Sequence, residues 1–190
     1  MADQLYLSYW VNGYTENNML RHYERLLKLF PYSRLTRGET TFRVIPVSYA
    51  EPALLERPFK SPPEIAGVLA AAKEFQHPDC CYRLETAWDL WQFDTDWEVR
   101  PTPVSLCCLG PVFEQDLGEN LRIEFGIDTH FLPQPDLPNH ATMTQSNVKS
   151  LLKLVHDLDD ALRVEKRLLW TESGENFAEK LQQALAESER

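Results

Sequence analysis

The sequence lacks the short motifs that mark the commonest enzyme classes. It has only seven glycines in 190 residues. None of them forms the glycine-rich loops that hold the phosphates of a nucleotide. The nucleophile elbow GxSxG and the zinc-binding motif HExxH are also missing. These absences exclude sites that a single local motif builds, but they leave open an enzyme whose site is assembled from separate segments.

The sequence also lacks cysteines at metal-binding spacing. Its four cysteines form two adjacent pairs, Cys80-Cys81 and Cys107-Cys108. Zinc and thioredoxin-type sites need two residues between cysteines so that both sulfur atoms converge. Neighbouring residues on a strand point to opposite faces instead. We therefore expect packed, reduced thiols in a reducing compartment, with no metal site and no cofactor.

Long apolar runs are missing as well. No stretch approaches the roughly 18 apolar residues that a membrane-spanning helix needs. The N-terminus, MADQLYLSYW, has no basic segment before its apolar residues, so it does not resemble a secretory signal. These observations predict a cytoplasmic protein that does not bind a membrane.

Negative charge is abundant and unevenly distributed. The formal net charge is −10. Residues 61–142 carry four Lys/Arg and fourteen Asp/Glu, and their difference equals the whole excess. Proteins that bind nucleic acids carry the opposite sign on their binding surface. We therefore expect no direct binding to nucleic acid.

The centre of the chain has the alternation of half-buried strands. We predict strands over Tyr82–Phe93, Pro103–Leu109 and Leu121–Phe131. In the last of these, Leu121, Ile123 and Phe125 alternate with charged residues or glycine. A two-residue period of this kind indicates one face on the core and one charged face.

The N-terminal segments predict two more strands and two helices. Alternation indicates strands over Gln4–Asn12 and Thr40–Ser48. An apolar stripe at helical spacing predicts a helix from Thr15 to Phe30, which Pro31 ends. Ser61-Pro62-Pro63-Glu64 is typical of the start of a second helix.

The C-terminal quarter reads as helical. Leucines at helical spacing predict a helix from Met143 or Thr144 to about Trp170, followed by a short helix from about Glu175. A helix of about 27 residues is roughly 40 Å long. Five strands span only about 24 Å. The mismatch leaves the far end of this helix without cover from the sheet.

These segments together predict a single α+β domain over residues 1–190. Its two layers are a mixed or antiparallel sheet of about five strands and helices on one face of that sheet. Residues 1–142 form the sheet and two helices. Residues 143–190 form a C-terminal helical hairpin, consisting of the long helix and the short terminal helix.

A polar set on the predicted strands is the first candidate site. If the strands of Glu85 and Glu124 pair in register, these side chains gather on one sheet face with Asp89, Asp128 and His130. Carboxylates beside a histidine could hold a hard metal ion, or act as an acid and a base. Arg/Glu alternation on an exposed sheet is, however, more typical of cross-strand ion pairs.

Two further segments carry candidate binding residues. Trp91 and Trp97 lie near a strand end among aspartates, where aromatic rings suit a sugar, a cation or a protein partner. Arg21, Arg25 and Lys28 share one flank of the first helix, which we expect to be solvated. Thr15, Asn17 and Asn18 lie at the start of that helix, where free backbone N–H groups could receive an anion, as they could at any capped helix.

The sequence favours a non-enzymatic domain that binds another protein or its own copy. The predicted acidic sheet face and the overlong helix motivate this hypothesis. One alternative is a small metal-assisted hydrolase or isomerase that uses Glu124, Asp128 and His130. A second alternative is a small-molecule carrier with a pocket between sheet and helices, lined by Tyr9, Phe42, Trp88 and Phe125.

Overall fold

The structure, a computed structural model, describes residues 2–188. Residues 1, 189 and 190 of the predicted domain lie outside this range. The order of elements is β1 (Gln4–Val11), α1 (Met19–Leu29), β2 (Glu39–Pro46), β3 (Leu55–Lys60), α2 (Ile65–Glu74), β4 (Cys80–Phe93), β5 (Trp97–Leu109), β6 (Leu121–Ile127), the 3₁₀ helix η1 (Asp128–Phe131), α3 (His140–Ala161), β7 (Val164–Thr171) and α4 (Phe177–Ser188). The protein is α+β, as predicted.

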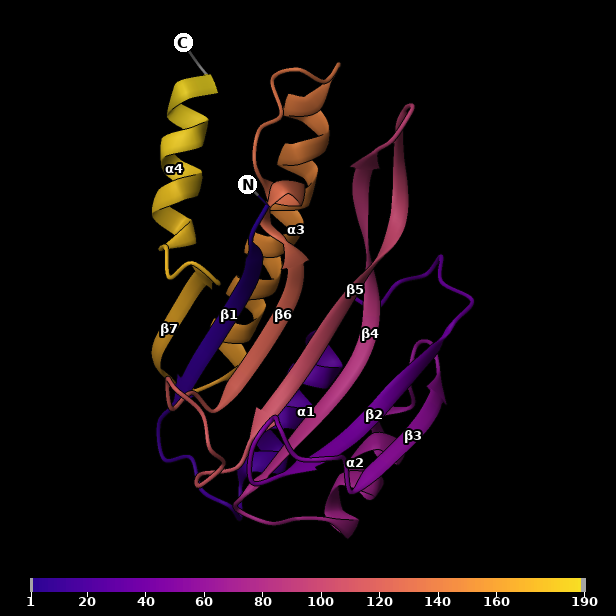
Figure 1. Ribbon diagram of the computed structural model, residues 1–190, viewed down its shortest axis with the longest axis vertical. Coiled ribbons are helices and arrows are strands. Elements are labelled where there is room, and N and C mark those ends of the chain that lie inside the picture. Colours follow the sequence, from indigo (N-terminus) through magenta and orange to yellow (C-terminus); the bar gives the residue numbers. More distant parts are fainter. Residues whose placement is uncertain (1, 189–190) are drawn as a thin grey trace.

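The sheet has seven strands rather than about five, and every pair of neighbours is antiparallel. The strand order is β3-β2-β4-β5-β6-β1-β7 (Figure 1). The prediction missed both edge strands. β3 lies in the proline-rich segment that was read as a loop, and β7 lies in the segment that was read as helix. Within the described residues, no helix has the length and apolar composition that crossing a membrane requires.

The predicted C-terminal helical hairpin is wrong because β7 separates α3 from α4. α3 ends at Ala161, and Leu162 already has an extended backbone. β7 then pairs with β1 along its length, and α4 follows beyond it (Figure 1). α3 is thus roughly 33 Å long, close to the roughly 34 Å that seven strands span at the same spacing of about 4.8 Å. The length mismatch that motivated a dimer through this helix therefore disappears.

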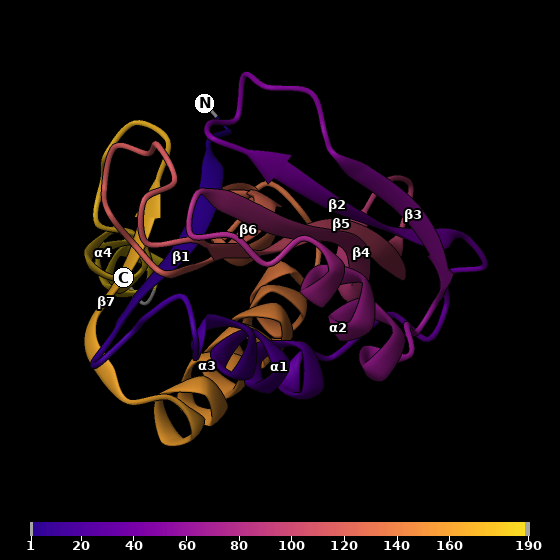
Figure 2. The ribbon, with the colours of Figure 1, turned by 90° about the horizontal axis from the view of Figure 1, so that it is seen from below.

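The helices α1, α2 and α3 lie together on one face of the sheet (Figure 2). The core lies between them and the sheet, where alternate residues of the strands meet the apolar sides of the helices. Trp88 contacts Phe30, Phe125 and Phe131 at its centre. α4 packs against β7 and η1 instead, through Phe177 among others. Within residues 2–188, no helix covers the opposite face of the sheet (Figure 2), and we call this face the open face.

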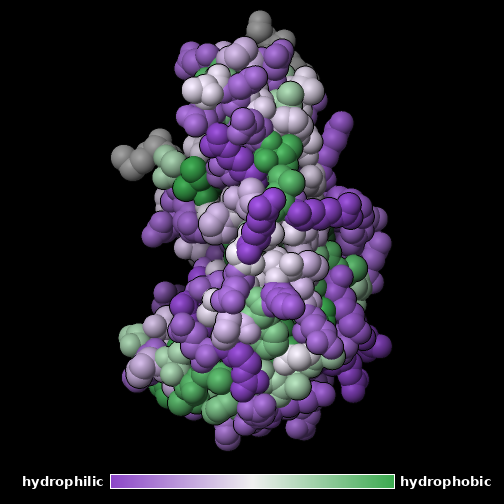
Figure 3. Space-filling model, turned by 90° about the vertical axis from the view of Figure 1, so that its right-hand side faces the viewer, coloured by the Kyte–Doolittle hydropathy of each residue, from purple (hydrophilic) through white to green (hydrophobic). Residues whose placement is uncertain are grey.

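The sheet divides in its middle. β4 and β5 pair from Cys81 and Leu109 as far as Phe93 and Trp97, whereas β5 pairs with β6 only between residues 105 and 108. The β4–β5 hairpin therefore extends away from β6, as Figure 1 shows. From the side on which β3 lies, hydrophobic residues form separate small patches among polar ones (Figure 3).

Candidate functional site

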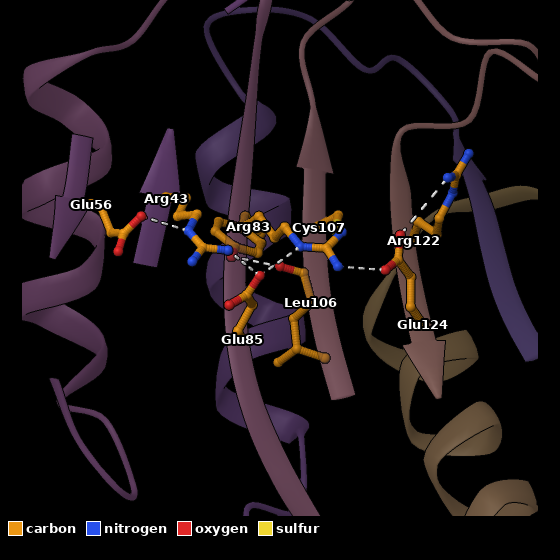
Figure 4. Close-up of polar contacts among 9 residues, drawn as sticks. Arg43, Glu56, Arg83, Glu85, Leu106, Cys107, Arg122 and Glu124 are labelled. Carbon is orange, nitrogen blue, oxygen red and sulfur yellow. Dashed lines mark hydrogen bonds and ion pairs between the residues drawn. The ribbon is translucent and has the colours of Figure 1, made fainter. Parts of the chain in front are cut away.

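The strand register builds a row of ion pairs across the open face. Arg43 lies opposite Arg83, Arg83 opposite Cys107, and Cys107 opposite Arg122. Two residues further along the strands, a parallel line contains Glu85 and Glu124, which both lie opposite Ser105. Arginines therefore stand beside glutamates. We call this set the ion-pair row: Arg43, Glu56, Arg83, Glu85, Arg122 and Glu124 (Figure 4).

Arg83 is the centre of the ion-pair row. Its Nε lies 3.3 Å from Glu85, and its Nη2 lies 2.7 Å from Glu124, two strands away. The small side chain of Cys107 lies between them and accepts a hydrogen bond from Nη1 at 3.7 Å. Burial opposes the charge on Arg83, but Cys107 and the two glutamates outweigh it and raise its pKa. The predicted residues Glu85 and Glu124 are thus joined through one arginine.

Aromatic rings surround the other end of the ion-pair row. The guanidinium of Arg122 lies within 5.6 to 5.9 Å of the ring centroids of Tyr6, Tyr49 and Trp170. Tyr6 and Trp170 are stacked, with 4.5 Å between their centroids. Arg122 also pairs with Glu119, whose side chain is fully buried. These contacts fix Arg122 and leave it only 13% exposed.

A groove opens on the open face where β5 separates from β6. Its volume is about 520 Å³. We call this groove the open-face groove, and its lining includes Gln4, Tyr6, Arg83, Glu85, Ser105, Glu124 and Glu172. Burial raises the pKa of the Tyr6 phenol, and the negative charges of Glu124 and Glu172 raise it further.

The structure gives Asp128 and Glu124 different partners, and His130 lies in η1. The carboxylate of Asp128 is buried, lies 2.9 Å from Lys180, and accepts a hydrogen bond from the backbone N–H of Asp3. His130 lies in η1, and burial lowers its pKa. Glu124 contacts Arg83 instead. Within the described residues, no three His, Cys, Asp or Glu side chains form a group that could hold a metal ion.

Asp89, Trp91 and Trp97 contact three separate parts of the chain. Asp89 accepts hydrogen bonds from the loop after α1, at 2.5 and 2.9 Å. The backbone of Trp91 exchanges two hydrogen bonds with the side chain of Asn147 in helix α3. The indole N–H of Trp97 donates to the carbonyl of Pro138 at 2.6 Å. The lining of the open-face groove includes none of these three residues.

The side chains expected to line a pocket between sheet and helices form the core instead. Tyr9, Phe42, Trp88 and Phe125 are at most 1% exposed and belong to one packed cluster. Trp88 and Asp89 also border a cavity of about 310 Å³ between the end of α1 and α3. This cavity is smaller than the open-face groove.

Several residues of the open-face groove were not predicted as site residues, among them Tyr6 and Glu172. Tyr6 was placed correctly on a strand, on the side opposite Leu5 and Leu7, but it was not named as a candidate. Glu172 directly follows β7, which was read as helix. β7 has no regular alternation of buried and exposed residues, so the local pattern held no signal for this strand.

The chain matches no known family model, no curated protein and no solved structure. Its function must therefore be inferred from its own geometry.

Proposed function

We propose that this protein is a non-enzymatic binding domain whose open-face groove receives a basic segment of another protein. The observation that carries the proposal is the groove itself, which lies on the face without helices and is lined by Glu85, Glu124 and Glu172. Carboxylates on a concave surface attract Lys and Arg side chains and increase the rate of encounter with a basic partner.

The charge that lines the open-face groove is unequal. Three glutamates (Glu85, Glu124 and Glu172) and one arginine (Arg83) line it. Glu172 has no ion pair with any residue in the range 2–188. A lysine or arginine of a partner would supply the missing positive charge at this position.

The open face is also large and rigid enough to bind a protein. Seven strands at a spacing of about 4.8 Å span roughly 34 Å. A face of this width that extends about 25 Å along the strands has roughly the area of 800 Å² that each partner buries in a typical protein complex. Arg83 and Arg122 are already fixed by their ion pairs and ring contacts, so little side-chain freedom is lost on binding.

Site-specific photocrosslinking tests this proposal. A photoreactive amino acid at position 172 should cross-link a protein in extracts of the cells that make this chain. The same amino acid at Glu64, an exposed residue at the start of α2 on the other face, is the matched control. We expect an adduct at position 172 alone, with the cross-link on a Lys/Arg-rich segment, and less of it as salt is raised.

Neutralising variants give the quantitative comparison. Glu172→Gln and Glu64→Gln each remove one negative charge, but only the first is expected to weaken binding of the partner identified in this way. Equal adducts at both positions, or no adduct at position 172, would contradict the proposal. An adduct of two copies of this chain would also contradict it, because the occupant would then be a second copy.

A further inference from the structure

A second concave site lies on the helix side of the molecule, and its charge has the opposite sign. It forms where the turn between β1 and α1 meets the link between α3 and β7. Its volume is about 250 Å³. We call it the basic pocket, and its lining includes Gly13, Asn18, Arg21, His22, Arg25 and Arg163.

The segments around the basic pocket are held by their own hydrogen bonds. The Asn18 side chain accepts from the backbone N–H of Thr15 and donates to the carbonyl of Gly13, both at 2.8 Å. The backbone N–H of Asn12 donates to the carbonyl of Arg163, also at 2.8 Å. The pocket is therefore formed before any ligand binds.

The arginines of the basic pocket have no negative partner. Within residues 2–188, no carboxylate forms an ion pair with Arg21, Arg25 or Arg163. Arg25 donates one hydrogen bond, at 3.3 Å, to the carbonyl of Ala161 at the end of α3. The arginines of the ion-pair row are all paired. In a chain of net charge −10, three unpaired arginines around one pocket concentrate positive charge there.

His22 provides an independent observation. It lines the basic pocket, yet its residue surface is only 6% exposed. Its buried Nδ1 has no hydrogen-bond partner among the described residues. Buried polar groups are nearly always paired, so this unpaired nitrogen beside the three arginines is a polar group that the chain itself leaves unsatisfied. Burial, the largest cause, and the three arginines lower the pKa of His22.

We propose that the basic pocket binds a phosphate group, either free or as the ester of a small molecule. Guanidinium groups bind oxyanions through paired N–H donors. Arg21, Arg25 and Arg163 come from two different segments, and a tetrahedral phosphate has enough oxygen atoms to accept from all three. A single carboxylate has only two oxygens. The volume suits a phosphate with a small substituent, since ligand pockets for larger molecules begin near 300 Å³.

Titration calorimetry at constant ionic strength tests this assignment on the full chain. The probes are inorganic phosphate, glycerol 3-phosphate and acetate. We expect saturable binding of at least one phosphate and none of acetate. Arg21→Gln and Arg163→Gln should each weaken that binding at least about tenfold, as expected for a lost charge-assisted hydrogen bond. Both side chains belong to exposed residues, so these variants should fold.

Arg37→Gln is the matched control, because Arg37 is exposed and does not line the basic pocket. It should change the affinity less than twofold. Nuclear magnetic resonance provides a direct readout, since the ring signals of His22, assigned with His22→Gln, should move when phosphate is added.

The comparison of probes identifies the source of the phosphate. Tighter binding of glycerol 3-phosphate supports an ester, and equal binding supports the free ion. The proposal is overturned if neither phosphate binds, if acetate binds as tightly, or if Arg37→Gln and Arg163→Gln weaken binding equally.

Discussion

The buried ion pair between Asp128 and Lys180 predicts a large loss of stability when the lysine is removed. Asp128 is fully buried, and the Lys180 side chain is 31% exposed. In Lys180→Met, the carboxylate keeps a hydrogen bond from the backbone of Asp3 but loses its counter-ion. Breaking a buried pair on one side costs about 3–5 kcal/mol. We expect about 3 kcal/mol, the lower limit, because Lys180 is partly solvated and one donor remains.

Urea unfolding followed by circular dichroism measures this loss. Lys153→Met is the matched control, because Lys153 pairs with Asp157 at 2.7 Å but its side chain is 75% exposed. An exposed pair of this kind contributes about 0–1 kcal/mol. The double variant Asp128→Asn/Lys180→Met should recover part of the loss, because it leaves no buried unpaired charge; Glu175, which also pairs with Lys180 at 3.1 Å, is solvated. Equal losses in Lys180→Met and Lys153→Met would refute the reasoning.

Three further predictions follow from backbone packing and from buried titratable groups. Gly110→Ala should destabilise the fold by at least about 2 kcal/mol in thermal unfolding, because its new methyl group would overlap backbone atoms. Gly38→Ala is the control and should be nearly neutral, because its methyl group would meet only a side-chain oxygen at 3.4 Å. At pH 8, thiol reagents should label Cys80 and Cys108 slowly in the folded protein and quickly in urea, because burial raises their pKa values to about 11 and about 12. Stability should fall as pH rises above about 10, the unfolded pKa of tyrosine. Burial raises the pKa of Tyr23 in the folded protein, so the stability that this residue contributes is complete below about pH 10 and is lost above it. A pH series of urea midpoints that stays flat from pH 9 to 11 would contradict this.

The sequence was sufficient to predict the helices and strands that have strong local periodicity. The stretch from Leu121 to Ile127 alternates cleanly and is β6, although its last predicted residues form η1 instead. The stripe from Met19 to Leu29 is α1. In both elements, one regular side of the pattern faces the core, so local pattern and tertiary packing agree.

The two missed strands lie where local signals conflict. β3 contains Pro58 and alternates between half-buried and exposed residues, because it is an edge strand with little core contact. β7 continues the leucine spacing of α3, and only the extended backbone at Leu162 separates them. Its pairing with β1, more than 150 residues earlier, is a tertiary contact that no window of sequence contains.

The candidate site was predictable only in part, because it depends on strand register as well as on local alternation. Alternation placed Glu85 and Glu124 on one face, but their connection through Arg83 depends on the register of β4, β5 and β6. Asp128 was expected on the same face because the strand was predicted to continue to Phe131. The turn into η1 at Asp128 sends its side chain toward Lys180 instead.

The position of β1 has a consequence for how the chain reaches this structure. β1 precedes the other six strands in the sequence, yet its two neighbours are β6 and β7, which follow all the others. Until residue 171 has left the ribosome, one edge of this apolar strand lacks its partner in the sheet. We therefore expect slow folding that depends on the synthesis of β7, and a nascent β1 segment that needs protection from aggregation.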